Sequence, residues 1–326
     1  MNKQILVLRE GFRILNAISP KTSAKFAEKI FLSIRKPNLT DKEKAFLRTA
    51  RQYNVPFKGT HIVTYEWGQK DAPAVLLVHG WNSSAAAYID LVPKLLSEGY
   101  RVISYDMVSH GFSPRYLAQI TCWADAVRSV LRYYGKVDSI IGHSLGGAGI
   151  LIASKLGLST DKIILVAPCS DLVDISDRFA QMLNIPDNVI QMKRSSIWSK
   201  FEKTVERYGK DWIDIFSSKF KVPTLIIHDR NDEDLSPNNS VRIKRKWPWA
   251  KLEYTEKLGH QRILHDEMTL NRVVSFVMRT QTNDWSVENF NYHHAYSQYD
   301  ESAQYKDQYR EHKGKVYVAS PDGFAH

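Results

Sequence analysis

The stretch SIIGHSLGGAGILIASKLG, residues 139–157, joins two different patterns around one serine. Its first residues form a short apolar run that is typical of a buried strand, and its last residues have the length and composition of a helix. Gly142, Ser144 and Gly146 therefore place a G-x-S-x-G pattern at a strand–turn–helix junction. Small residues are needed there because larger side chains beside such a tight turn would collide. The pattern predicts that the Ser144 hydroxyl projects from the turn, with the N–H of Leu145 pointing to where an oxyanion would form.

Short apolar runs alternate with helical patterns from about residue 60 onward. This alternation predicts an α/β fold with a mostly parallel central sheet and helices on both faces. The predicted strands are 61–67, 74–80, 101–106, 139–144, 162–167, 224–229 and 251–256. The predicted helices are 84–98, 118–134, 145–157, 238–247 and 263–279. In such a sheet the reactive groups gather beyond the carboxyl ends of the strands.

A serine hydroxyl needs a base that takes its proton before it can act as a nucleophile. His143 is the nearest histidine in sequence, but adjacent side chains at a strand end point to opposite faces, so we expect it to diverge from the serine. His260, in EKLGHQRIL (256–264), follows the last predicted strand and opens the next loop. We predict His260 as the base, with His265 and His110 as the alternatives.

The third group of such a site is a carboxylate that fixes the tautomer of the base and stabilises its protonated form. The segment IIHDRNDEDLSP, residues 226–237, follows another strand and offers four carboxylates. Asp229 is too close to the strand to reach across, and Glu233 is expected to be a solvated turn residue. We predict Asp232 as the acid, with Asp234 as the alternative.

The chain order serine, aspartate, histidine with a G-x-S-x-G turn resembles the α/β-hydrolase superfamily, in particular its carboxylesterase-like serine hydrolases. VHGW (78–81) is similar to the family's H-G oxyanion loop, and RVISYDMVSHGFSP (101–114) is similar to its D-x-x-G-H-G-x-S segment, with Ser109 in place of the first glycine. The similarity covers about residues 60–280.

The resemblance implies a role for five residues. Ser144 would be the nucleophile, and Asp232 and His260 its partners. The backbone N–H groups of Trp81 and Leu145 would form the oxyanion hole.

These residues lead us to expect a serine hydrolase that cleaves small-molecule carboxylic esters through an acyl-enzyme on Ser144. A thioesterase, lipase or acyltransferase would use the same triad, and a non-catalytic ligand-binding protein of this fold is a further alternative. Related enzymes with aspartate at the elbow, such as dehalogenases, are excluded by the serine. The mechanism needs no metal or cofactor, and none is expected.

The first 60 residues carry most of the chain's excess positive charge, with 13 basic and four acidic side chains against a net charge of +10. Helical periodicity and a Thr40–Glu43 capping box predict two or three amphipathic helices, so residues 1–58 are interpreted as a basic helical extension. We expect their apolar faces to pack on the main domain, with a weak peripheral membrane contact through residues 1–35 as the alternative. Nucleic-acid binding is not expected, because no aromatic-interleaved basic sheet or recognised motif is present.

The rest of the chain is interpreted as a hydrolase core, an insertion and a tail. The core spans residues 59–282, with an apolar helical cap at about 169–221 because that connection is too long for a single crossover helix. Residues 283–326 form a polar, tyrosine-rich tail with one strand-like run at 315–320. No signal-peptide or membrane-spanning pattern is found, so a cytoplasmic location is expected.

Overall fold

The computed structural model describes residues 3–31, 34, 36–116, 120–170, 180–181, 183–189, 221–279, 309–312 and 315–318. The chain divides into two compact units, Met1–Thr282 and Asn283–His326. Within the second unit, β9 (Tyr309–His312) pairs antiparallel with β10 (Lys315–Val318). The strand predicted at 315–320 is thus present, whereas β9 was not predicted. Most of the cap predicted at 169–221 lies outside the described residues.

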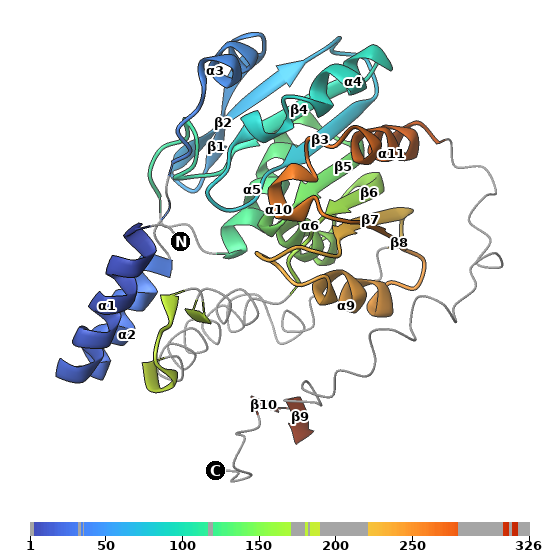
Figure 1. The fold of residues 1–326 in the computed structure, drawn as a ribbon. Coiled ribbons are helices and arrows are strands. Elements are labelled where there is room, and N and C mark those ends of the chain that lie inside the picture. Colours follow the sequence, from blue (N-terminus) through green and yellow to red (C-terminus); the bar gives the residue numbers. More distant parts are fainter. Residues whose placement is uncertain are drawn as a thin grey trace. The chain divides into compact units, whose positions relative to one another are not determined.

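In the described part of the first unit, eight strands form one sheet in the order β1-β2-β4-β3-β5-β6-β7-β8 (Figure 1). The pairs β1–β2 and β2–β4 are antiparallel, and the other neighbours are parallel. The strands are β1 (Arg51–Phe57), β2 (Thr60–Trp67), β3 (Ala74–Val78), β4 (Arg101–Asp106), β5 (Val137–His143), β6 (Thr160–Val166), β7 (Thr224–Asp229) and β8 (Lys251–Thr255). The predicted mostly parallel α/β architecture is confirmed.

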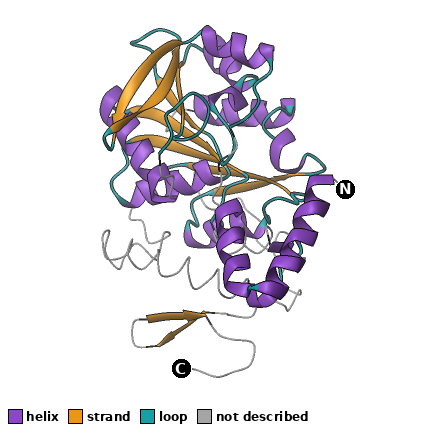
Figure 2. Ribbon diagram, turned by 90° about the vertical axis from the view of Figure 1, so that its left-hand side faces the viewer, coloured by secondary structure: helices purple, strands orange, loops and turns teal. Residues whose placement is uncertain are grey.

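Helices cover both faces of the sheet (Figure 2). The described helices are α1 (Lys3–Ile18), α2 (Pro20–Phe31), α3 (Asp41–Arg48), η1 (Ala85–Tyr88), α4 (Leu91–Ser97), α5 (Ile120–Tyr134), α6 (Leu145–Lys155), α9 (Asn238–Lys246), α10 (Gly259–Arg262) and α11 (Glu267–Met278), of which α1 and α2 lie away from the sheet. Within the described chain, no helix is both long and apolar enough to cross a membrane.

Consecutive residues of the central strands supply two separate cores. Leu76 and Ile140 pack with α5, α6 and α9, whereas the next residues, Leu77 and Ile141, pack with α3, α4 and α11. Adjacent side chains of a strand point to opposite faces, so a strand covered on both sides must be apolar at nearly every position. This is why these strands read as continuous apolar runs in the sequence.

The boundary of the predicted N-terminal extension is wrong by one strand. Residues 51–57, assigned to the helical extension, form β1 and pair with β2 along their whole length. Only Val55 and Phe57 are buried in β1, as suits an edge strand, and Pro56 is tolerated there because an edge strand has no neighbour on one side. With so few apolar positions, the strand pattern was too weak to see.

The capping box predicted at Thr40 is present at the start of α3. The Glu43 backbone N–H donates to Thr40 Oγ1 at 3.2 Å, and the Glu43 carboxylate accepts the Thr40 N–H at 2.7 Å. The helix predicted at 263–279 is present as α11 but begins at Glu267, because the side chain of Asp266 caps its start by accepting the N–H of Thr269.

Candidate active site

Ser144 lies at the sharp turn between β5 and α6, as the sequence pattern predicts. Its backbone has φ 54° and ψ −122°, a strained conformation that non-glycine residues rarely adopt. The turn depends on the absence of a side chain at Gly146, where a Cβ atom would lie 2.1 Å from the carbonyl oxygen of Val78. Strand β3 and the start of α6 are therefore in direct backbone contact beneath the serine.

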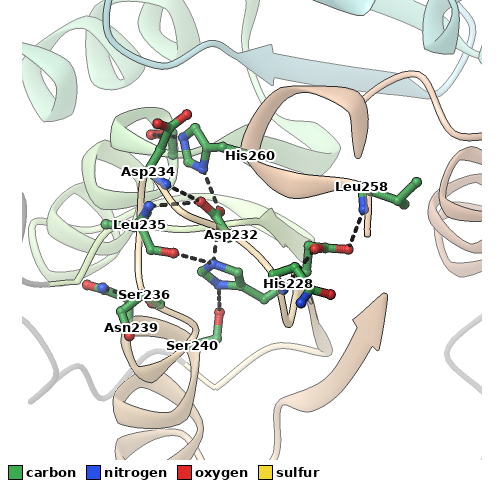
Figure 3. Close-up of polar contacts among 12 residues, drawn as sticks. His228, Asp232, Asp234, Leu235, Ser236, Asn239, Ser240, Leu258 and His260 are labelled. Atoms are coloured by element: carbon green, nitrogen blue, oxygen red, sulfur yellow. Dashed lines mark hydrogen bonds and ion pairs between the residues drawn. The ribbon is translucent and has the colours of Figure 1, made fainter. Parts of the chain in front are cut away.

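His260 and Asp232 lie in line with this serine. The Ser144 hydroxyl donates to His260 Nε2 at 2.9 Å. In turn, His260 Nδ1–H donates to Asp232 Oδ2 at 2.7 Å (Figure 3). Asp232 follows β7, and His260 lies in α10, which follows the neighbouring strand β8. Ser144 and His260 are 116 positions apart in the sequence, and the structure brings them together with Asp232.

Both oxygens of the buried Asp232 carboxylate accept hydrogen bonds from neighbouring residues. Oδ1 accepts the backbone N–H groups of Asp234 at 3.0 Å and Leu235 at 2.8 Å. Oδ2 accepts from His260 and also from His228 Nε2 at 3.2 Å. Burial acts to raise the pKa of Asp232, but the hydrogen bonds from His228 and His260 outweigh it and hold the pKa well below its usual value. The carboxylate therefore stays ionised while it holds His260.

His228 is a member of this cluster that the sequence analysis did not single out. Its side chain is fully buried, and Nε2 also lies 3.1 Å from the carbonyl oxygen of Leu235. Both neighbours of Nε2 are acceptors, so this nitrogen carries the proton, and Nδ1 accepts from the Ser240 hydroxyl at 2.7 Å. The buried run of β7 gives no signal for this role, because the role depends on the position of the loop that follows β7.

His143 contacts the backbone of the base rather than the serine hydroxyl. His143 Nε2–H donates to the carbonyl oxygen of His260 at 2.9 Å, and the two ring centroids are 4.7 Å apart. Burial, and then the nearby His260, lower the pKa of His143 to about 3, so its ring is neutral at ordinary pH. Although His143 is adjacent to Ser144 in sequence, its side chain therefore holds the loop that carries His260.

Asp229 connects the loop that carries Asp232 to the loop that carries His260. Its Oδ2 accepts the Leu258 N–H at 3.0 Å and the Thr255 hydroxyl at 2.8 Å, while Oδ1 accepts the Asn231 N–H at 2.9 Å. The sequence analysis excluded Asp229 as the acid, and the structure places it away from the imidazole of His260. Its carboxylate instead fixes the backbone just before the base.

The backbone at Gly80 and Trp81 lies beside the serine. A Cβ atom at Gly80 would be 2.9 Å from Ser144 Cβ, so only glycine allows this approach. Trp81 follows directly, and its ring stacks on Trp123 at 5.4 Å between centroids. Leu145 is the first residue of α6, where backbone N–H groups have no partner within the helix. Both residues expected to form the oxyanion hole thus lie next to residues that contact or adjoin Ser144.

Ser109, which replaces the family's glycine, has the φ of 67° that favours glycine. Its hydroxyl accepts the Tyr116 N–H at 2.8 Å and stabilises the turn. Nearby, the buried Asp106 carboxylate accepts the N–H groups of Ala85 and Phe112, both at 2.8 Å. Ser109 thus adopts a backbone conformation that favours glycine, and its hydroxyl stabilises the turn.

The alternative bases and acid lie elsewhere. His265 Nδ1 contacts Asp90 at 2.6 Å on the exposed surface. His110 is buried, with Nδ1 hydrogen-bonded to the carbonyl oxygen of Val108 at 3.0 Å. The side chain of Asp234 is exposed, and only its backbone N–H contacts the cluster.

The chain belongs to the alpha/beta hydrolase family, whose model matches residues 75–275. It is 29% identical over 130 residues to a serine hydrolase-like protein of Dictyostelium discoideum, covering 36% of this chain and 33% of that protein. It is 33% identical over 95 residues to a bifunctional esterase/perhydrolase of Acinetobacter calcoaceticus, covering 28% of this chain and 34% of that protein. The matches thus span about a third of the length of these two relatives.

A solved structure shows the same fold. The crystal structure of an esterase from Rhodococcus sp. superposes with a TM-score of 0.51 at 18% identity, over 70% of this chain and 98% of that one. At this identity the likeness concerns the fold alone, and membership of the family rests on the match to its model.

Proposed function

We propose that the protein cleaves carboxylic esters through an acyl-enzyme on Ser144. The observation that carries the proposal is the continuous hydrogen-bond chain from Ser144 Oγ through His260 to Asp232, with distances of 2.9 and 2.7 Å. A hydroxyl, an imidazole and a carboxylate in this order form the arrangement that activates serine as a nucleophile. The esterase activities named for relatives are consistent with this proposal.

In the first half of the reaction, Ser144 Oγ attacks the ester carbonyl carbon and its proton moves to His260 Nε2. Asp232 stays ionised and stabilises the imidazolium, as its lowered pKa requires. The carbonyl oxygen becomes an oxyanion that accepts the N–H groups of Trp81 and Leu145. The bond to the leaving oxygen then breaks, and His260 gives its proton to the departing alcohol.

In the second half, water replaces the alcohol. His260 takes a proton from water, the hydroxide attacks the acyl carbon, and Ser144 leaves with the proton that His260 returns. A thiol leaving group or an acceptor alcohol would pass through the same acyl-enzyme. Thioester cleavage, lipase activity and acyl transfer are therefore outcomes to be tested with the same substrates.

We assign His228, Asp229 and His143 as positioning residues. His228 holds the Asp232 carboxylate, while His143 and Asp229 hold the backbone on either side of the His260 ring. A histidine that is fixed in this way loses little entropy when it accepts the proton. The barrier to reaction is therefore lower than it would be with a mobile histidine.

The test combines a fluorophosphonate probe with a panel of p-nitrophenyl esters of increasing acyl length. The probe should label the native protein, mass spectrometry should place the adduct on Ser144, and Ser144→Ala should abolish both labelling and turnover. Asp234→Asn is the matched control, because it alters an exposed carboxylate beside the cluster and should keep both. Labelling of another serine, or turnover that survives Ser144→Ala, would overturn the proposal.

The panel also separates the alternatives. Turnover that rises with acyl length or requires emulsified substrate would favour a lipase, and faster cleavage of matched thioesters would favour a thioesterase. A folded protein that neither labels nor turns over any ester would favour the non-catalytic binding protein.

A further inference from the structure

Large apolar side chains are exposed along the two N-terminal helices, which lie side by side (Figure 1). Within the described residues, five of the ten exposed large hydrophobic side chains belong to α1 and α2. They are Leu6 (42% exposed), Val7 (72%), Ile14 (55%), Ile18 (76%) and Phe26 (40%). Such a concentration on two short helices is typical of a binding surface rather than of scattered surface hydrophobes.

Three of the four exposed large apolar residues of α1 form one stripe. Val7, Ile14 and Ile18 are separated by seven and four positions, which at 3.6 residues per turn places them along the same side of the helix. Gly11 lies between them and adds no side chain that would cover the stripe. The stripe is therefore a continuous apolar edge.

The opposite face of this hairpin already has a partner. Phe12, Ala24 and Ala27 are buried in a cluster with Leu183 and Val189, from the described part of the predicted cap. Part of the apolar surface of the hairpin thus packs against the predicted cap. Val7, Ile14 and Ile18 remain exposed although the hairpin is docked.

Positive charge is exposed on the neighbouring helix, α2. Lys21, Lys25 and Lys29 are spaced four residues apart on α2, so they line one side of it. The acidic Glu10 of α1 is paired with Arg13 at 2.8 Å, which reduces its repulsion of anions. Exposed aliphatic residues combined with lysines suit an anionic lipid surface, in which apolar groups enter the headgroup boundary and lysines meet phosphate and carboxylate groups.

We propose that the α1–α2 hairpin, with Val7, Ile14 and Ile18 as its inserting edge and the three lysines of α2 as its electrostatic contact, docks the protein on a membrane surface that contains anionic lipid. The binding is peripheral and reversible, because the apolar edge is short. It is also sensitive to salt, because the lysines are solvent-exposed. The proposal concerns a surface outside the catalytic cluster and does not depend on the reaction.

The test is co-sedimentation of the full-length protein with vesicles of phosphatidylcholine alone and of phosphatidylcholine mixed with phosphatidylserine. We expect binding to the mixed vesicles, weaker binding to the neutral ones, and loss of binding as salt is raised. The triple variant Lys21→Gln/Lys25→Gln/Lys29→Gln should bind about a hundredfold more weakly, since each lysine near an anionic surface contributes about fivefold.

The apolar edge is tested by the triple variant Val7→Ser/Ile14→Ser/Ile18→Ser, which should bind more weakly to neutral and mixed vesicles alike. The matched control is Met268→Ser/Met278→Ser on α11, which removes exposed apolar side chains outside the hairpin. The matched control for charge is Lys42→Gln/Lys70→Gln/Lys246→Gln, which removes three exposed lysines elsewhere. Both controls should bind as the unaltered protein does, and circular dichroism with an unfolding midpoint confirms that every variant is folded.

Vesicle binding that is unchanged in both hairpin variants, or that is lost equally in the controls, would overturn the proposal. A protein that ignores vesicles but sediments as a dimer, and becomes monomeric in the Val7/Ile14/Ile18 variant, would also overturn it and would assign the edge to self-association. The unaltered protein's turnover of a soluble ester serves as a separate readout, so failure of docking is distinguishable from failure of the proposed reaction.

Discussion

Replacing Asp232 by asparagine should convert the hydrogen-bond chain into one that holds the wrong tautomer of His260. The amide oxygen is retained where Oδ1 accepts the N–H groups of Asp234 and Leu235. The amide nitrogen then replaces Oδ2, which accepts from His260 at 2.7 Å and His228 at 3.2 Å. A donor now faces two donors, so His260 moves its proton to Nε2 and can no longer accept the proton of the serine.

Loss of the nitrogen that accepts the serine proton should lower kcat strongly. The same tautomer change in the well-studied serine proteases, a worked case of this type of site, costs about 10⁴ in kcat. Four powers of ten correspond to about 5 kcal/mol in the activation free energy. We expect a loss of that order for Asp232→Asn, with KM little changed because the carboxylate is buried away from substrate.

The assay is steady-state hydrolysis of the best p-nitrophenyl ester, with Asp234→Asn as the control. Asp234 is adjacent in the loop but its side chain is exposed, so its variant should stay within about twofold of the unaltered protein. Circular dichroism should show that both variants are folded. If Asp232→Asn keeps a tenth or more of the activity, or if Asp234→Asn loses as much, then the assignment of the acid is wrong.

Three further predictions concern His228, the elbow and the buried histidines. His228→Ala removes one charge-assisted hydrogen bond from Asp232 and should lower kcat about 10- to 100-fold with KM unchanged. A loss of folding stability large enough to account for the lower kcat would instead mean a purely structural role. Gly146→Ala forces a Cβ atom to 2.1 Å from the Val78 carbonyl oxygen and should lower the free energy of unfolding by about 1–3 kcal/mol. Gly11→Ala has open space around it and should be neutral or stabilising. Urea unfolding compares the two variants. Burial lowers the pKa of three histidines below the ordinary 6.5, so at lower pH the unfolded chain binds protons that the folded chain does not. As pH drops from about 6.5 toward 4, each of these histidines should lower the free energy of unfolding by up to about 1.4 kcal/mol per pH unit. Urea unfolding at about pH 7.5 and about pH 5.5 measures this, and equal stabilities would contradict it. The histidines are His79, with a pKa lowered to about 4, and His110 and His143, each lowered to about 3.

The central sheet was predictable because its signals are local. The strands β3 to β7 are covered on both faces, so each has an apolar run that can be recognised without knowing its neighbours. β1 was missed for the opposite reason, since an edge strand with two buried residues carries little pattern of its own. Its place in the sheet comes from pairing with β2, which is a property of two segments together.

The candidate site was predictable where chemistry and chain order restrict the choice. Ser144 is recognisable from its glycine neighbours, because the turn excludes larger residues. His260 and Asp232 could be named from their positions after β8 and β7, since parallel strands deliver their carboxyl ends to one edge of the sheet. Neither inference required a distance.

The sequence by itself therefore determined the fold class, the place of Ser144 at the turn and the side of the sheet on which Asp232 and His260 lie. Only the tertiary structure decided that His228 shares the Asp232 carboxylate, that His143 and Asp229 hold the backbone around the base, and that Val7, Ile14 and Ile18 stay exposed after the hairpin has packed. The physical reason is the range of the interactions. Periodicity and turn chemistry act within a few residues, whereas these contacts depend on how separate loops and helices approach one another in the folded chain.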